Sequence, residues 1–479
     1  MGQDNERNII KAISVLGSVQ IINIIIGICR SKVISILMGP AGMGILSLYQ
    51  STSDIVSSIS NMGLSTTAVK DISKSYSQED ITNVSYVISV FRKLINLTGF
   101  ASLLICTIFS PLFSYINFGD YQHTYFFILL GLSLFMIQQV AGYTTLLQGS
   151  RNFKKMAQGT MAGNVIGLFF CIPLYYIWRE TAIVPVLVLS SIINFFVLRY
   201  FSDKMNIPII RVGYKEAVRY GNSMLKTGFF VCLQGLFALL YIYMLRLYIT
   251  HTSSLKDVGL FNAGMIIVNT YVGLIFSSMG TEYYPRLSSI NNNDAFISTI
   301  NNQIVRCITL LTPLICLLLF LMPVVIRILY TEQFLPISLM SMLLLTSVCF
   351  KVFEWSIGFS FLAKGKTNVL FINELFFKIY TFLISILLFE RVSLTGIGVS
   401  YIISEILFCF QSFLVSKKIF NFCVYKETYL SLLGASSMVT ICMLSIVFDF
   451  KFKIIICSIC LCISIYRMYQ YYQKNIRHA

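Results

Sequence analysis

The sequence has few charged residues and few histidines, and both shortages exclude classes of protein. Only 12% of its 479 residues are charged, whereas a soluble protein has about 25%. The three histidines, His123, His251 and His478, are far apart in the sequence and offer no plausible acid–base cluster for an enzyme. With 56% hydrophobic residues and a mean hydropathy of +0.78, we expect an all-α, polytopic membrane protein.

Signals for export, disulfides and metals are missing as well. The N-terminal residues show no cationic segment followed by a short apolar core and a cleavage site, so no cleaved leader is expected. The thirteen cysteines are mostly scattered through apolar runs and imply no disulfide framework. Cys457, Cys460 and Cys462 lie close together, but in an apolar helix without a nearby histidine. We therefore expect no metal and no cofactor.

The long apolar runs predict fourteen membrane-spanning helices, each able to cross about 30 Å of hydrocarbon. They cover residues 12–37, 43–69, 86–113, 124–147, 157–178, 181–201, 223–250, 257–283, 304–330, 335–362, 368–389, 394–416, 428–448 and 452–468. The second window is the weakest by hydropathy. Its polar residues, including Gln50 and Asp54, nevertheless fall on one helical face, as expected of a helix that lines an aqueous cavity.

The distribution of lysine and arginine indicates how the chain is oriented. With both termini on the cytoplasmic side, most Lys and Arg residues fall on that side, as cytoplasmic connections require. The outer side then holds only Arg179, Lys256, Arg327, Arg391, Lys451 and Lys453. This asymmetry accounts for much of the net charge of +16. No nucleic-acid partner is expected.

The chain contains an internal repeat with offsets of 215 to 217 residues. Arg30, Gly44 and the turn at residues 61–63 recur as Arg246, Gly259 and residues 278–280. An even number of helices separates the copies, so the repeats are parallel. We therefore expect two pseudo-symmetric six-helix lobes, residues 1–212 and 213–423. Two extra helices and a cytoplasmic tail follow in residues 424–479.

Arg30 and Lys32 lie inside the first predicted helix, where a cation costs roughly 2.5–3.5 kcal/mol. Arg30 shares a polar face with Asn23, whereas Lys32 lies off that face and is the weaker candidate. Arg246, Asn262 and Asn269 lie in the matching helices of the second half. The other possibility is that Arg30 and Lys32 lie near a helix end and extend to the lipid headgroups.

The remaining intramembrane charges are candidates for counter-ions or coupling groups. Lys351 with Glu354 and Glu374 with Lys378 have helical spacing, so each pair can neutralise itself on its own helix. Glu405 has no such partner on its helix and can pair with either lysine. In the first half, Asp54 shares the proposed polar cavity with Arg30, where it can act as a counter-ion or a proton site.

Four segments resemble a known family of exporters. They are RSKVISILMGPAGMGILSLYQS from Arg30, TEYYPRLS from Thr281, FKVFEWSIGFSFLAKGK from Phe350 and NELFF from Asn373. Together with the two-lobed repeat, they resemble the multidrug/oligosaccharidyl-lipid/polysaccharide (MOP) exporter superfamily. Within it the chain is similar to the Wzx-type O-antigen translocases, over about Ile9 to Lys418.

The resemblance implies a flippase that works by alternating access in the bacterial inner membrane. Its substrate would be an undecaprenyl-diphosphate-linked oligosaccharide for lipopolysaccharide or a similar surface polysaccharide. Its partners would be membrane lipids, a glycan polymerase and a chain-length regulator. Arg30 and Arg246 match, by location, the arginines that face the diphosphate in related lipid II flippases. The extra C-terminal pair of helices departs from the twelve-helix pattern of many Wzx proteins.

Two other functions remain open at this point. A drug or cation antiporter of the same fold needs a proton or sodium carboxylate and an apolar pocket, and no pair of repeated arginines. A membrane glycan polymerase or glycosyltransferase is the candidate from another class, but polymerases of this kind resemble proteins with a large external loop. All outer connections predicted here are short.

The predicted topology can be tested with reporter fusions. A reporter placed after Lys155 or at the C-terminus should be cytoplasmic, and one placed after Tyr121 should be external, because of the Lys/Arg asymmetry. An external C-terminus would mean that one of the last two helices does not cross the membrane.

Overall fold

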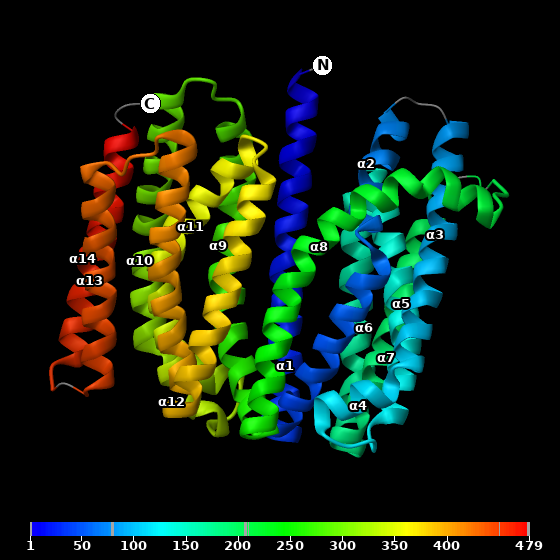
Figure 1. The fold of residues 1–479 in the computed structure, drawn as a ribbon, viewed down its shortest axis with the longest axis horizontal. Coiled ribbons are helices and arrows are strands. Elements are labelled where there is room, and N and C mark those ends of the chain that lie inside the picture. The colour runs from blue at the N-terminus through cyan, green and yellow to red at the C-terminus, as the bar shows by residue number, and fades with distance from the viewer. Residues whose placement is uncertain (1, 78–80, 206–207, 209, 450, 477–479) are drawn as a thin grey trace. The chain divides into compact units, whose positions relative to one another are not determined.

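The computed structural model describes residues 2–77, 81–205, 208, 210–449 and 451–476. These residues form fourteen α-helices and two short 3-10 helices, and no strand occurs among them (Figure 1). The all-helical fold predicted from the sequence is confirmed. Helices suit a chain of this hydropathy, because each helix satisfies its own backbone hydrogen bonds in hydrocarbon.

The first seven helices account for the first six predicted windows. They are α1 (Gly2–Asn61), α2 (Leu64–Ser77), α3 (Ile81–Ile108), α4 (Ser110–Phe118), α5 (Thr124–Gly149), α6 (Phe153–Trp178) and α7 (Ile183–Asp203). The first window and most of the second lie in α1, which bends between them. Gly39 has a φ of 63° and Pro40 follows it, and proline removes one helix hydrogen bond while glycine tolerates the positive φ.

The second half is built from α8 (Tyr214–Thr252), α9 (Leu255–Ser288), α10 (Asn293–Leu329), α11 (Ser338–Ala363), α12 (Thr367–Phe420), α13 (Lys426–Val447) and α14 (Lys453–Ile476). Two 3-10 helices, Arg179–Ala182 and Glu332–Ile337, precede α7 and α11. α12 contains two predicted windows and bends at Val392 and Ser393. Residues 278–280 are continuous helix within α9. The turn at residues 61–63 is therefore not repeated there, and this part of the predicted repeat is wrong.

Ten stretches of the described chain are long and apolar enough to cross a membrane. Three of them, 22–61, 153–203 and 367–420, have 40, 51 and 54 residues. Each contains a bend or a 3-10 turn near its middle and is long enough for two crossings. Residues 223–250 of α8, which the sequence predicts to cross the membrane, are not among these ten stretches. The chain is a multi-pass membrane protein.

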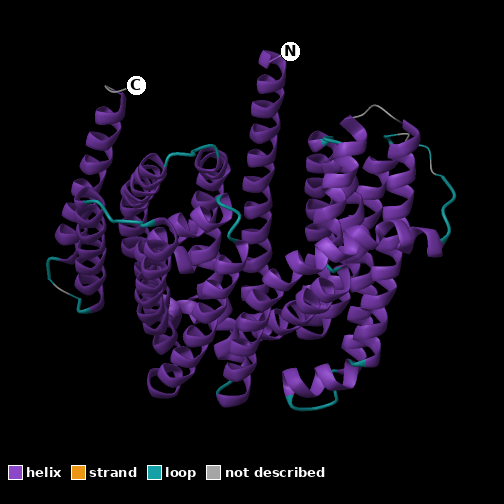
Figure 2. Ribbon diagram, turned by 45° about the horizontal axis from the view of Figure 1, so that its top comes forward, coloured by secondary structure: helices purple, strands orange, loops and turns teal. Residues whose placement is uncertain are grey.

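The helices pack into two compact units, Met1–Gly259 and Leu260–Ala479. In unit 1 the start of α1 and the end of α2 lie at one end of the helices, and α4 lies at the other end, as Figure 1 shows. In unit 2, α13 and α14 lie side by side, and both pack against α10 (Figure 2). The division falls inside α9, so α8 packs with unit 1. The lobe boundaries drawn from the sequence repeat stay a prediction.

Close backbone contacts hold α1 against α9, and the turn after α1 against α8, within unit 1. A Cβ atom at Gly44 would overlap the carbonyl oxygen of Leu255, and one at Gly63 would overlap that of Gly228. Gly63 also has a φ of 67°, which L-residues rarely adopt. Glycine is required at these positions because no side chain fits between the two backbones.

Replacing Gly63 with alanine should therefore destabilise the protein through both strain and overlap. Gly119→Ala is the matched control, since Gly119 has a φ of 80° but open space around the missing Cβ. Left-handed strain alone costs about 1–2 kcal/mol, and we expect a larger loss for Gly63→Ala. The detergent melting temperatures of the two variants measure the difference. Equal losses would contradict the proposed backbone contact.

Candidate functional site

Arg30 lies in the first part of α1, where its guanidinium faces α6. The side chain is half-buried, and Tyr175 and Cys171 of α6 are its electrostatic neighbours. Its Nε and Nη2 atoms are buried without a hydrogen-bond partner among the described residues. The Tyr175 hydroxyl is close, yet it too makes no hydrogen bond of normal geometry. A buried cation with unmet donors is unfavourable by itself and favours an anion or water beside it.

Unit 1 also contains a cavity of about 510 Å³, whose described lining does not include Arg30. α1, α5, α6 and α7 form its walls, and Gln50, Asp54, Asn164 and Asn194 are among its polar lining residues. Asp54 is exposed to it and is the one charged side chain among the described residues of the lining. The predicted polar face of the second window therefore does line a cavity. Chemically, this cavity offers one carboxylate and several amides and hydroxyls.

Asn23 connects Arg30's helix segment to the cavity wall. Its side-chain oxygen accepts a hydrogen bond of 3.0 Å from Asn164, the same residue that lines the cavity. Lys32, the weaker sequence candidate, is half-buried. Asn23, Gln50 and Asp54 thus belong to one polar region of unit 1.

Arg246 of α8 is bound to the second part of α1. Its Nη1 donates hydrogen bonds to the Ser51 hydroxyl and to the Ser47 carbonyl, the latter at 3.4 Å. Asp54 lies one helical turn beyond Ser51, and Arg246 is the charge that acts on it. The sequence analysis placed Asp54 with Arg30, whereas the structure gives it Arg246 as its cationic neighbour. Arg246 is therefore partly compensated, unlike Arg30.

The two asparagines of α9 have different surroundings. Asn262 is buried and Asn269 is exposed, although the sequence places both on one polar face. Both belong to unit 2, whereas Arg246 and Arg30 belong to unit 1.

Five charged residues of α11 and α12 form one electrostatic group rather than two separate pairs: Lys351, Glu354, Glu374, Lys378 and Glu405. Glu354 interacts electrostatically with Glu405, Glu374, Lys351 and Lys378. Glu405 interacts with both lysines, as the sequence suggested for at least one of them. The expected pairing within single helices is therefore only part of a network that links α11 with both parts of α12.

Several polar residues of these sites were missed in the sequence. Asn164 and Tyr175 lie in an apolar window, and Tyr380 lies next to the charges of unit 2. Asn164 could have been singled out from the sequence, because it is a single amide in an apolar helix. Such amides form hydrogen bonds between helices in membranes. Nothing in the local sequence distinguishes Tyr175 or Tyr380 from the other tyrosines.

Histidines and metal-binding groups do not form a site among the described residues. His123 forms a hydrogen bond of 2.9 Å with Tyr49, and His251 one of 2.7 Å with the Ile116 carbonyl. Burial lowers the pKa of His123, although nearby Asp120 opposes that shift. His478 lies outside the described residues. Within the described chain, no three His, Cys, Asp or Glu residues are arranged to hold a metal.

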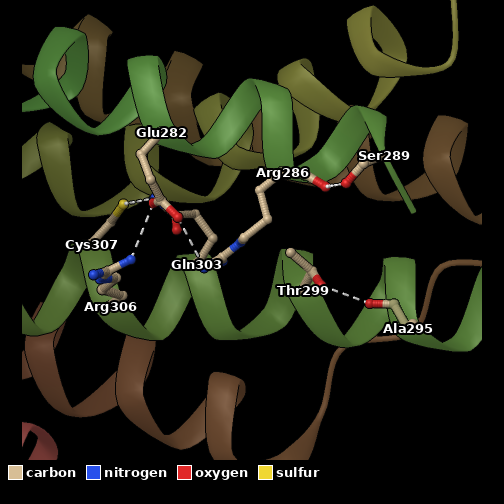
Figure 3. A network of polar contacts seen from close by, with 8 residues as sticks. All are labelled: Glu282, Arg286, Ser289, Ala295, Thr299, Gln303, Arg306 and Cys307. Carbon is tan, nitrogen blue, oxygen red and sulfur yellow. Dashed lines mark hydrogen bonds and ion pairs between the residues drawn. The ribbon is translucent and has the colours of Figure 1, made fainter. Parts of the chain in front are cut away.

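A separate polar network joins α9 to α10 at an exposed position (Figure 3). Glu282 forms ion pairs with Arg286 at 3.1 Å and with Arg306 at 3.2 Å. Exposed pairs of this kind contribute about 0–1 kcal/mol. We therefore assign this network to the packing of the α9–α10 hairpin and not to a ligand site.

Residues 33–339 match the family described as polysaccharide biosynthesis protein. The chain belongs to this family. No curated protein sequence matches it. Among solved structures, the fold is similar to that of the lipid II flippase MurJ in an inward closed conformation. That match has a TM-score of 0.70 and 14% identity, and it covers 98% of this chain and 100% of MurJ.

The fold is also similar to two other transporters of the MOP superfamily. One is a MATE family multidrug resistance transporter in an inward-facing conformation, with a TM-score of 0.62, 14% identity and coverage of 84% and 94%. The other, from Pyrococcus furiosus, is described as having a binding pocket of reverse polarity, with a TM-score of 0.62, 12% identity and coverage of 86% and 96%. The predicted fold, that of the MOP superfamily transporters, is confirmed. The chain is thus a member of a polysaccharide biosynthesis family with the fold of these transporters.

The electrostatic pairing of Asp54 with Arg246 can be tested by a double-mutant cycle. Asp54→Asn and Arg246→Met should each lower the melting temperature, and the double variant should lose less than the sum, because each single change leaves one charge uncompensated. Directly interacting residues typically show coupling of about 0.5–3 kcal/mol. In the control cycle, Asp54→Asn with Arg30→Met should be additive. Coupling to Arg30 alone would contradict the assignment.

Proposed function

We propose that this protein is a flippase that moves an undecaprenyl-diphosphate-linked oligosaccharide, an O-antigen or similar surface glycan repeat, across the bacterial inner membrane. The observation that carries the proposal is the buried Arg30 guanidinium, which has unmet hydrogen-bond donors inside a membrane-spanning helix. Membership of a polysaccharide biosynthesis family supports a glycan substrate. Similarity over the full length of a lipid II flippase supports a lipid-linked one.

The chemistry of the substrate explains why arginine is needed. A diphosphate cannot cross hydrocarbon without its hydration shell unless the protein offers cationic, hydrated surroundings. The planar guanidinium meets two phosphate oxygens at once, which lysine cannot do. In this proposal Arg30 binds the diphosphate, Arg246 assists, and the amides of Asn23 and Gln50 contact the headgroup. The polyprenyl tail stays in lipid throughout.

The same proposal includes orientation and partners. Both termini face the cytoplasm, so glycosyl carriers made there enter from the side rich in Lys and Arg. A glycan polymerase and a chain-length regulator are the partners that would receive the product outside.

A drug or cation antiporter is the second candidate, and one observation favours it. The cavity of unit 1 is lined by Asp54, which is the kind of carboxylate that a proton- or sodium-coupled antiporter requires. Deletion of the gene distinguishes the two functions. Loss of surface glycan supports the flippase, whereas unchanged glycan with increased drug sensitivity supports the antiporter.

Arg30→Ala should strongly reduce surface glycan while the protein stays inserted and abundant, because the anion then loses its buried donor. Arg30→Lys keeps the charge but not the paired donors, so its effect should be intermediate. Lys154→Ala is the matched control, since Lys154 is exposed and lies at the start of α6. Glycan display is measured per amount of membrane protein. Normal display in Arg30→Ala would refute the contact with the diphosphate.

A further inference from the structure

Five charged side chains on α11 and α12 of unit 2 lie within predicted crossings and interact with one another. Lys351 and Glu354 lie on α11, Glu374 and Lys378 on the first part of α12, and Glu405 on its second part. We call these five residues the α11–α12 cluster. Their mutual electrostatic interactions link all three helical segments. The diphosphate site proposed for unit 1 uses none of them.

Side-chain contacts between the two parts of α12 show which of their residues lie at the same height along the two antiparallel segments. The contacts are Ser385 with Ser400 at 2.7 Å, Phe377 with Phe408 at 4.3 Å between ring centroids, and Asn373 with Ser412 at 3.0 Å. All three belong to one antiparallel register. In this register Glu405 is level with Tyr380, between the serine pair and the stacked phenylalanines. Polar and aromatic contacts therefore enclose Glu405 on both sides.

Glu405 is the most enclosed carboxyl of the cluster. Only 3% of the residue is exposed, and its Oε2 atom has no hydrogen-bond partner among the described residues. The hydroxyl of Tyr380 is also buried without such a partner. An ionised carboxylate only accepts hydrogen bonds, and one oxygen here receives none. A protonated carboxyl can donate as well, so this environment suits an acid that carries a proton.

The formal charge of the cluster leads to the same conclusion. Three carboxylates and two ammonium groups leave one negative charge when all five are ionised. A net charge buried within the membrane is strongly unfavourable. Adding one proton makes the cluster neutral without breaking either lysine–carboxylate attraction. The composition of the cluster therefore favours one bound proton.

Other titratable groups near the cluster are few. Cys409 faces Glu405 and Glu354, and its thiol contacts the Phe350 carbonyl at 3.2 Å. Tyr380 faces the same two carboxyls. α10 and α13 also pack on α11, but among the described residues they add no charge that acts on the three glutamates. Two ammonium groups within the cluster would repel a metal cation, which leaves the proton as the fitting ligand.

We propose that the α11–α12 cluster is a proton-binding site, with the proton held on Glu405, and that its protonation is the coupling step of transport. The second part of this statement rests on the proposed function. The step itself is simple: the Glu405 carboxylate takes one proton from water and becomes a carboxylic acid, and it returns the proton on release.

Infrared difference spectroscopy of the purified full-length protein tests the site without any substrate. Across a pH titration, the wild-type protein should show a carboxylic-acid C=O band that Glu405→Gln lacks. Glu427→Gln is the matched control, because it removes an exposed carboxylate in the first turn of α13 and should keep the band. A band that persists in Glu405→Gln, or is never seen in the wild type, would overturn the site.

A second variant keeps the test decisive if Glu405→Gln does not fold. Lys351→Gln removes one positive charge from the cluster, so the band should appear at a higher pH than in the wild type. An unchanged titration in this variant overturns the proposal.

Coupling is tested by surface glycan display in cells, with Glu405→Gln compared with Glu427→Gln. Normal display in Glu405→Gln would overturn the coupling step. If gene deletion leaves glycan unchanged, the proposed function fails, and the infrared result still decides the proton site.

Discussion

The removal of charged groups from water is the constraint on which this structure depends. Hydrocarbon makes an unpaired ion expensive, so every intramembrane charge needs a neighbour, a cavity or a ligand. Arg246 has Ser47, Ser51 and Asp54 beside it, and the charges of unit 2 interact with one another. Arg30 has unmet donors instead. The proposal that Arg30 binds an anion rests on its two buried nitrogens, Nε and Nη2, and on the cost of burying such donors unpaired.

The backbone obeys a related constraint. Bends at Gly39 and at Val392 and Ser393 join consecutive crossings without a loop, so α1 and α12 each run through both. A bend exposes fewer backbone groups than a loop, which matters where lipid cannot accept hydrogen bonds. Glycines then allow α1 to approach α8 closely. The helix that carries Arg30 is thereby held firmly at its second part, next to the helix that carries Arg246.

The sequence was sufficient for the fold, but not for the contacts that the candidate residues make. Length and hydropathy predict all-helical crossings because both reflect the thickness of hydrocarbon. Partners depend on the rotation and register of separate helices, which a single sequence does not contain. The sequence analysis therefore paired Asp54 with Arg30 instead of Arg246. It also did not single out Tyr175 as a neighbour of Arg30. The predicted repeat wrongly matched the turn at residues 61–63 with residues 278–280. The two segments are similar in sequence, but residues 278–280 are helical.

The two proposed sites require opposite charge balances, and this gives a physical reason for coupling them. A bound diphosphate neutralises Arg30, but its release leaves that buried cation exposed to low dielectric again. The empty transporter therefore has the greater barrier to changing its conformation. The α11–α12 cluster is neutral with a proton and negative without one, so it adds a second charge state that a membrane potential can act on. A carrier with both sites can use proton movement to offset the unfavourable return step, which a carrier with Arg30 alone cannot do.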